Sequence, residues 1–134
     1  MPVIMWTEDL SVGVELIDQQ HKELFDHINR FTDAMFDGKA KEEVGKLLTF
    51  LADYVVLHFG AEEKLMFQHQ YPAYESHKEV HDRFVHEFIK VKTRYDAGEM
   101  NSSSIITVFD GMWTWLRQHI RVTDKALGEF VRRA

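Results

Sequence analysis

Histidine and glutamate occupy positions that helical spacing would otherwise give to apolar side chains. His58 and Glu62 are four residues apart, and so are His77 and His81. Because four residues advance an α-helix by nearly one full turn, the two side chains of each pair point the same way. Imidazole nitrogens and carboxylate oxygens are typical ligands of iron, manganese and zinc. The pairs therefore indicate a metal site inside a helical protein.

Two single histidines extend this set. His21 lies three residues before Leu24, and His119 lies three residues after Leu116, so each continues an apolar stripe. A lone buried histidine is more often a hydrogen-bonded core residue than a ligand, and this alternative applies to each one taken singly. Burying five imidazoles and a carboxylate without strong partners would cost several kcal/mol each at worst. Metal coordination supplies the missing partners.

The elements that must position these residues are four amphipathic helices, because apolar residues recur at steps of three and four along four segments. The segments run from Asp18, as the cap of the first helix, to Gly38, from Val44 to Met66, from His77 to Gly98, and from Ile105 to Ile120. Short connections make neighbouring helices antiparallel. The predicted fold class is all-α, an up-down-up-down four-helix bundle.

Two further segments flank the bundle. The first 17 residues are predicted to form a non-helical N-terminal arm, anchored by Trp6 and Val12. The tail after Thr123 is predicted to form a short C-terminal helix.

Gly60 lies inside the second helix, and crowding between His58 and Glu62 would explain a glycine there.

The bundle places the candidate histidines of all four helices at one level along its axis. His21 and His77 are near the starts of their helices, whereas His58 and His119 are near the ends. In an antiparallel bundle, starts and ends alternate at one end of the molecule. All candidate ligands are therefore expected at the same end.

Composition excludes several classes of function. The 134 residues contain no cysteine, which excludes disulfides, thiolate zinc sites, iron–sulfur clusters and cysteine nucleophiles. The net charge of −6 disfavours nucleic acid as a partner. No stretch approaches about 20 consecutive apolar residues, so no membrane span is expected. The N-terminus lacks a basic start and a long apolar run, which favours a cytoplasmic protein.

The ordered set of motifs resembles the hemerythrin family, in its single-domain bacterial form. The resemblance is carried by Trp6, Val12-Gly13-Val14, residues 18–24, residues 58–62, His77-Lys78-Glu79-Val80-His81 and residues 115–124. Any one of these motifs is a weak signal, but their order and separations are specific and cover nearly the whole chain. Residues 1–134 are therefore expected to form a single hemerythrin-like domain.

The resemblance implies a non-heme di-iron centre, oxo- or hydroxo-bridged, that binds dioxygen reversibly. One iron would take His77, His81 and His119, and the other would take His21 and His58. Glu62 and Asp124 would bridge the two irons. Seven ligands exceed the six that one octahedral ion accepts, so two ions are required, and one position stays open on the iron with two histidines.

Asp124 requires a departure from regular helix. It lies five residues after His119, which places it about 140° away around an α-helix. The helix is therefore predicted to unwind or bulge between Ile120 and Thr123. Without the resemblance, Asp124 could equally be a surface or capping residue.

An apolar wall should keep water from the open position. By resemblance, this dioxygen pocket would consist of Leu24, Phe59, Trp115 and Ile120. Plain core packing is the alternative role for these side chains. The sequence does not identify the hydrogen-bond partners of the second ring nitrogen of the ligand histidines. Tyr54, one turn before His58, is a candidate partner.

The remaining histidines and the basic tail are expected at the surface. These solvated residues are His27, His69 and His86, and the cluster of Arg117, Arg121, Lys125, Arg132 and Arg133. Docking of an acidic partner is the alternative role of the basic cluster.

The expected function is carriage, storage or delivery of dioxygen by a monomer that is not an enzyme, with an O2-consuming protein as recipient. Five neutral imidazoles with only two carboxylates favour the ferrous state, in contrast to carboxylate-rich di-iron bundles that activate oxygen. The alternatives are an oxygen sensor, a di-iron enzyme acting on peroxide or nitric oxide, and iron storage.

Overall fold

The computed structural model describes residues 5–36 and 40–133, which are helical apart from the arm and short turns. The elements are the 3-10 helix η1 (Glu8–Leu10), the helices α1 (Glu15–Phe36), α2 (Ala40–Gln68), α3 (Tyr74–Asp96) and α4 (Ser102–Gln118), the wider helical segment η2 (His119–Asp124) and the helix α5 (Lys125–Arg133). The described residues contain no strand. The predicted all-α fold class is confirmed.

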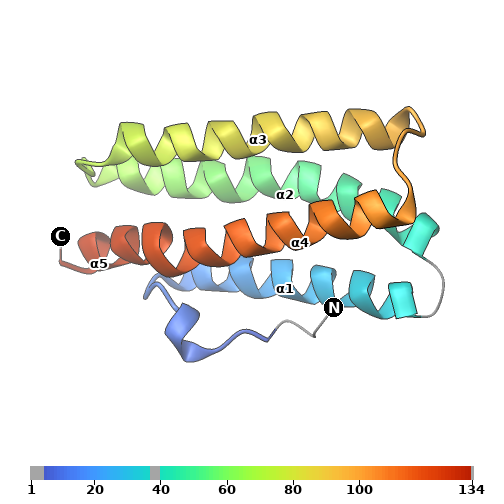
Figure 1. Ribbon diagram of the computed structural model, residues 1–134. Coiled ribbons are helices and arrows are strands. Elements are labelled where there is room, and N and C mark those ends of the chain that lie inside the picture. The colour runs from blue at the N-terminus through green and yellow to red at the C-terminus, as the bar shows by residue number, and fades with distance from the viewer. Residues whose placement is uncertain (1–4, 37–39, 134) are drawn as a thin grey trace.

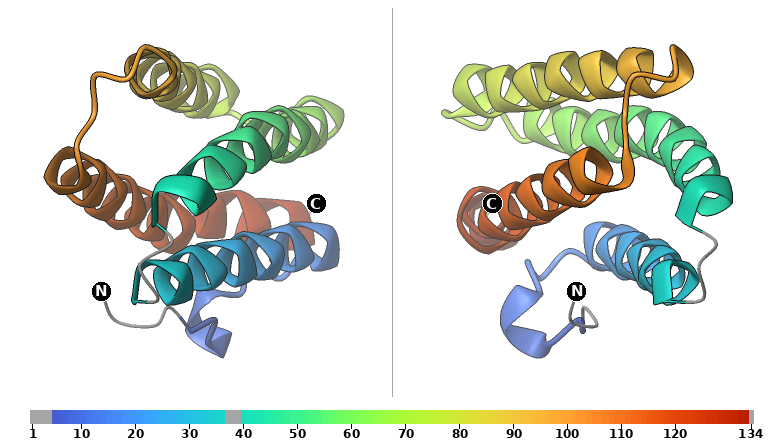
Figure 2. Two further views of the ribbon diagram at one scale, coloured as in Figure 1. Left: turned by 90° about the vertical axis from the view of Figure 1, so that its right-hand side faces the viewer. Right: turned by 45° about the vertical axis from the view of Figure 1, so that its right-hand side comes forward.

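Successive long helices run in opposite directions, and α5 continues the line of α4 through η2 (Figure 1). Viewed toward one end, α1 to α4 surround a common interior (Figure 2). α1 packs on α2, and α2 packs on α3. This is the up-down-up-down arrangement predicted from the short connections.

Aromatic and aliphatic side chains fill the interior away from the histidines. Phe25 meets Trp113 edge-on, with ring centroids 5.1 Å apart, and Phe31 lies 4.9 Å from Phe109. The buried residues of this half of the core also include Ile28, Val44, Leu47, Leu48, Leu51 and Ile105. Burial of apolar surface at about 25 cal/mol per Å² stabilises the bundle and holds the four helices in register.

The start of α1 differs from the prediction. Asp18 was expected to cap the helix, but α1 begins at Glu15, one turn earlier. The Asp18 carboxylate instead accepts hydrogen bonds from the Val12 backbone N–H at 2.8 Å and from the Ser11 hydroxyl at 2.6 Å. Asp18 therefore fixes the path of the arm into the helix. Gly38, the expected end of this helix, lies outside the described residues.

The arm is anchored as predicted, but the prediction that it is non-helical was wrong in part, because η1 forms within it and residues 15–17 belong to α1. Val12 is buried, and Trp6 is partly buried with the Lys22 ammonium 4.4 Å from the centre of its ring. α5 meets the arm closely at Gly128, where a Cβ would lie 1.8 Å from the Val12 carbonyl oxygen. Only a glycine allows this approach.

The basic tail is more than the solvated cluster that was expected, because part of it holds the arm. Arg121 pairs with the Asp9 carboxylate at 2.7 Å, and Lys125 donates to the Asp9 carbonyl oxygen at 3.1 Å. Both side chains of the Arg121–Asp9 pair are about half exposed, so the pair contributes little to stability by itself.

The explanation offered for Gly60 was wrong. Gly60 is exposed, and a Cβ added to it meets no atom within 4 Å. The side chains of His58 and Glu62 both turn to the interior, whereas the position between them faces outward.

α2 is a long helix with a high share of apolar residues. By length and composition alone, Glu43–Gln68 could cross a membrane, a test that core helices of soluble proteins also pass. Nearly half of this stretch is buried, and its buried face carries His58 and Glu62. Packing on α1 and α3 accounts for the buried apolar residues of α2, whereas Val56, Leu57 and Phe67 are exposed.

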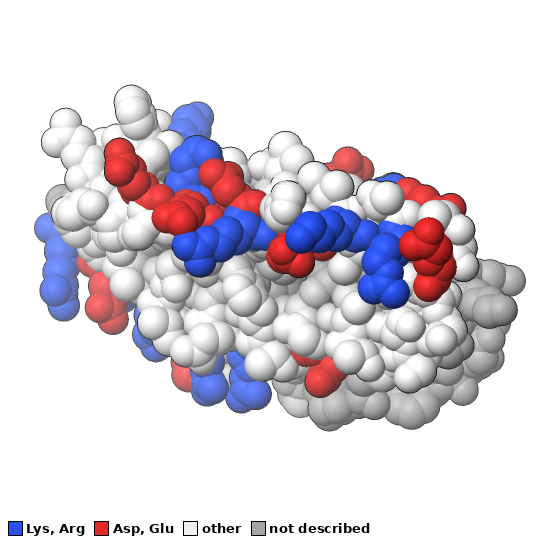
Figure 3. Space-filling view, turned by 45° about the horizontal axis from the view of Figure 1, so that its top comes forward, with Lys and Arg blue, Asp and Glu red and all other residues white. Residues whose placement is uncertain are grey.

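The outer face of α3 is polar, with alternating signs of charge (Figure 3). Its side chains pair along the helix as Lys78–Asp82, Arg83–Glu79, Lys90–Glu87 and Lys92–Asp96. Such exposed pairs add only a few tenths of a kcal/mol each. They identify this face as a solvated surface.

Candidate metal centre

The helix after Gln118 widens, as the position of Asp124 required. Over His119–Asp124 the backbone takes π-helical geometry, in which each N–H bonds to the carbonyl five residues earlier. Residues five apart then point to the same side, and the Asp124 carboxylate lies 3.0 Å from the Nε2 atom of His119. The predicted interruption of the fourth helix is confirmed.

The structure brings all seven predicted ligands into one buried cluster. Each is at most 5% exposed: His21, His58, Glu62, His77, His81, His119 and Asp124. The donor atoms form two groups, each with its members within 4.8 Å of one another. One group holds His77, His81 and His119, and the other holds His21 and His58. Glu62 and Asp124 belong to both groups.

Each shared carboxylate turns one oxygen toward each group. Glu62 Oε1 lies 2.9 Å from His81 Nε2, whereas Oε2 lies 3.4 Å from His58 Nε2. Asp124 Oδ1 lies 3.2 Å from His77 Nε2, whereas Oδ2 lies 3.2 Å from His21 Nε2. This is the arrangement that two carboxylates need to bridge a pair of cations.

The polar atoms of this cluster fit metal ions better than they fit one another. Both oxygens of Glu62 and of Asp124, and the Nε2 atoms of His77, His81 and His119, are buried without a well-formed hydrogen bond. Adjacent ligands of an octahedral ion at about 2.1 Å lie about 3 Å apart. The contacts of 2.9 to 3.4 Å match that spacing. The donor set is therefore suited to metal ions.

Burial keeps the histidines in the form that binds metals. Desolvation and the neighbouring His21 lower the pKa of His58 to about 3, and desolvation and His77 lower the pKa of His81 strongly. Both imidazoles are thus neutral at pH 7, with a lone pair free on one nitrogen. Histidine ligates metals in this neutral form.

The pKa values of the two buried carboxyl groups shift in opposite directions. Burial and the nearby Asp124 carboxylate raise the pKa of Glu62 well above its ordinary value. Burial alone would also raise the pKa of Asp124, but contacts with His119, His21 and His77 outweigh it and lower that pKa. Cations between the two groups would stabilise both carboxylates in their charged form.

Hydrogen bonds behind the cluster orient two of the histidines. His58 Nδ1 donates to the Gln20 side-chain oxygen at 2.6 Å, and His81 Nδ1 donates to the Glu63 carboxylate at 3.0 Å. Tyr54, the candidate suggested by the sequence, donates to the Gln20 backbone carbonyl at 2.6 Å instead. Its ring stacks on His58 with centroids 5.2 Å apart.

Two residues of the predicted apolar wall, Phe59 and Trp115, pack on histidines of the cluster. Leu24, Phe59 and Ile120 are buried, and Trp115 is partly buried. Phe59 stacks on His81 with centroids 3.9 Å apart, and Trp115 stacks on His119 at 4.8 Å. Aromatic rings therefore cover two imidazoles of the three-histidine group.

The other histidines lie outside the cluster. His86 is exposed and His69 is partly exposed, as expected. His27 is only partly exposed, because its ring stacks on Phe50 with centroids 3.5 Å apart, and burial lowers its pKa.

Comparison with known proteins agrees with this geometry. Residues 12–131 match the family model described as the hemerythrin HHE cation binding domain. A bacteriohemerythrin of Methylococcus capsulatus is 35% identical over 129 residues, which cover 96% of each chain. One of Stenotrophomonas maltophilia is 33% identical over 132 residues, covering 98% of this chain and 84% of the relative.

A solved structure gives the same result for the fold. The crystal structure of a wild-type hemerythrin aligns with a TM-score of 0.81 and 34% identity, covering 97% of this chain and 98% of that one. Because the family match spans most of the sequence and the paired donor groups could hold two iron ions, the chain belongs to the hemerythrin family.

Proposed function

We propose that this protein binds dioxygen reversibly at a di-iron centre, as a carrier, store or delivery protein. The observation that carries the proposal is the sharing of Glu62 and Asp124 between two buried groups of histidines. A single ion would not need a carboxylate oxygen on each of two sides. Nitrogen and oxygen ligands suit manganese as well as iron. Family membership supports iron as the metal.

The proposed ligands divide unequally. His77, His81 and His119 would hold one iron, His21 and His58 would hold the other, and each carboxylate would offer oxygens to both. The first group offers five protein donors and the second four. The iron on the side of His21 and His58 therefore has one more position free for a small molecule.

The chemistry that a ferrous pair supplies is the reversible transfer of two electrons to dioxygen. The residues of this chain supply neutral imidazole ligands, hold the ligands in position and exclude water. Five imidazoles with two carboxylates favour the ferrous state more than a carboxylate-rich set does. Leu24, Phe59, Trp115 and Ile120 form the proposed wall that separates the open position from solvent and anions.

Stopped-flow optical spectroscopy of the anaerobic diferrous protein mixed with dioxygen tests this function. We expect a charge-transfer band that forms with oxygen and disappears when oxygen is removed, with two irons per chain by elemental analysis. Rapid, irreversible passage to ferric iron with turnover of peroxide or nitric oxide would instead identify an enzyme. A stable band with no release on deoxygenation would contradict a carrier.

The proposed physiological form is a cytoplasmic monomer with one domain, delivering oxygen to an O2-consuming protein. The alternating charges on α3 support a solvated rather than an assembled surface. Gel filtration coupled to light scattering tests the monomer, and a mass of about 32 kDa, twice the 15.8 kDa of one chain, would contradict it.

A further inference from the structure

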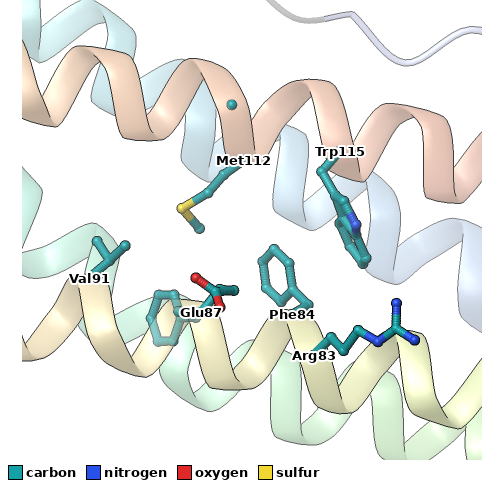
Figure 4. Close-up of a pocket in the computed structure, with 8 residues that line it drawn as sticks. Arg83, Phe84, Glu87, Val91, Met112 and Trp115 are labelled. Atoms are coloured by element: carbon teal, nitrogen blue, oxygen red, sulfur yellow. The ribbon is translucent and has the colours of Figure 1, made fainter.

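A cavity outside the metal cluster lies between α3 and α4. Its volume is about 230 Å³, and Figure 4 shows side chains from both helices directed into it. The apolar walls are Phe84, Phe88 and Val91 from α3 and Met112 and Trp115 from α4. A cavity of about 150 Å³ with such walls is large enough to bind benzene. This one has room for a ring with a substituent.

The glycine at the cavity is not required by packing. Gly111 lies in the middle of α4 and lines the cavity, yet a Cβ added there meets no atom within 4 Å. A glycine within a helix is less stable than alanine. A side chain could therefore be added at this edge of the cavity without a clash.

The charges at the rim are already paired within α3. The Arg83 guanidinium bonds to the Glu79 carboxylate at 2.6 Å, and Glu87 accepts from Lys90 at 3.2 Å. Arg83 and Glu87 are opposite in sign and lie one turn apart along the cavity. The cavity therefore favours a neutral occupant, because a charged one would bury its own charge against apolar walls.

The aromatic walls indicate the shape of the occupant. Phe84 stacks on Trp115 with centroids 4.6 Å apart, and Phe84 and Phe88 lie nearly parallel at 6.5 Å. Rings that line a cavity offer faces and edges to another ring at favourable offset or edge-on geometry. We propose that this cavity is a binding site for a small neutral aromatic molecule of one ring, separate from the metal site.

The proposal places such a molecule beside the metal cluster but not in it. Trp115 is the common wall, since it lines the cavity and stacks on His119 at 4.8 Å with its ring inclined by 10°. The binding itself depends only on the apolar walls. It therefore stands or fails independently of dioxygen binding.

Titration with toluene tests the site in the full-length protein as purified. Methionine methyl groups are labelled with ¹³C, and the Met112 resonance is identified from its loss in Met112→Leu. We expect a saturable shift of the Met112 methyl with a dissociation constant below the solubility limit of toluene. Absence of a saturable shift, or saturation at another methionine alone, would overturn the proposal.

Two matched variants separate the cavity from general effects on helices. Gly111→Leu adds a side chain that has room to occupy the cavity, and we expect toluene to bind at least tenfold more weakly. Gly60→Leu is the control, because Gly60 is also an exposed helical glycine with no atom within 4 Å, but it lies on α2. Unchanged binding in Gly111→Leu, or equal loss in both variants, would contradict the site.

Benzoate tests the chemical class. It keeps the ring but adds a charge, and we expect at least tenfold weaker binding than toluene. Equal or tighter binding of benzoate would show that the rim selects an anion and would overturn the neutral class.

Discussion

The Asp124 carboxylate reaches the Nε2 atom of His119 at 3.0 Å, although the two residues are five positions apart. In a regular α-helix they would diverge by about 140°. The π-helical geometry of η2 removes that divergence and turns Asp124 to the interior, where it is 1% exposed. A local departure from regular helix geometry thus completes the donor set.

The first prediction concerns Asp124. Asp124→Asn keeps the size of the side chain but removes the charge shared by the two donor groups. We expect the iron content to fall from two per chain to one or fewer, measured by elemental analysis after anaerobic reconstitution. Asp110→Asn, an exposed change on α4, is the control and should retain two. Full occupancy in Asp124→Asn would contradict its place among the ligands.

Gln20→Leu removes the acceptor of the His58 Nδ1–H. The imidazole then loses the bond of 2.6 Å that sets its orientation, and it keeps a buried donor without a partner. Loss of such an outer bond typically lowers metal affinity about 10- to 100-fold. Competition with an iron chelator measures this change. Gln68→Leu, which replaces an exposed glutamine, should have no effect on iron affinity. Equal retention of iron by the two variants would count against the role of Gln20.

Leu24→Ala opens space one turn from His21. Leu24 is 1% exposed, so the truncation leaves a cavity through which water can approach the proposed open position. We expect faster loss of the oxygenated form, followed optically, and a cost in stability of about 2–5 kcal/mol.

The matched control is Leu48→Ala, which truncates an equally buried leucine in the half of the core away from the histidines. It should lose similar stability without faster autoxidation. Equal autoxidation rates in the two variants would show that water entry at Leu24 is not the cause.

The free energy of unfolding of the metal-free chain should fall as the pH drops from 6.5 to 4.5. The folded pKa values of His58 and His81 lie far below the ordinary value of 6.5, so the unfolded state binds a proton on each that the folded state does not. Glu62 acts in the opposite sense, because burial raises its folded pKa. Because two histidines oppose one carboxyl group, the net effect is a loss of stability as the pH falls.

Urea unfolding followed by circular dichroism measures this slope. Glu62→Gln removes the opposing contribution and should make the fall steeper. A stability that is constant between pH 6.5 and 4.5 in the unmodified chain would contradict the assignment of neutral buried histidines.

Gly128→Ala tests the contact between the arm and α5. The new Cβ would lie 1.8 Å from the Val12 carbonyl oxygen, so the backbone must move. Strain of this kind costs about 1–3 kcal/mol, and we expect a lower midpoint of thermal unfolding. Gly60→Ala, in open space on α2, should raise stability by up to about 1 kcal/mol. An unchanged midpoint in Gly128→Ala would show that the arm can move away from α5 without cost.

The helices, and the placing of the histidines and Glu62 on inner faces at one end, could be predicted because they depend on spacing, whereas Asp124 was assigned by the family resemblance. Steps of three and four assign His58 and Glu62 to one face, and helix order assigns the histidines to one end. The same geometry showed that Asp124 needed an interrupted helix. Periodicity needs no knowledge of side-chain conformation, which is why these predictions were confirmed.

The contacts that the sequence did not predict cross between elements. Gln20 is on α1 and His58 on α2, so their bond depends on the relative rotation of the two helices and on two side-chain conformers. Glu63 reaches His81 from α2 to α3 in the same way. Gly60 was misjudged because crowding depends on what lies opposite a position, and nothing does.

The wide turn at η2 also changes the rotation of α5 around the helix axis relative to α4. One residue added to a helix rotates the downstream part by about 100° around the axis. α5 lies beyond this turn, and it presents Gly128 to Val12. The backbone insertion that aims a carboxylate inward also chooses which side of the last helix receives the arm, so a change of length there would disturb both junctions together.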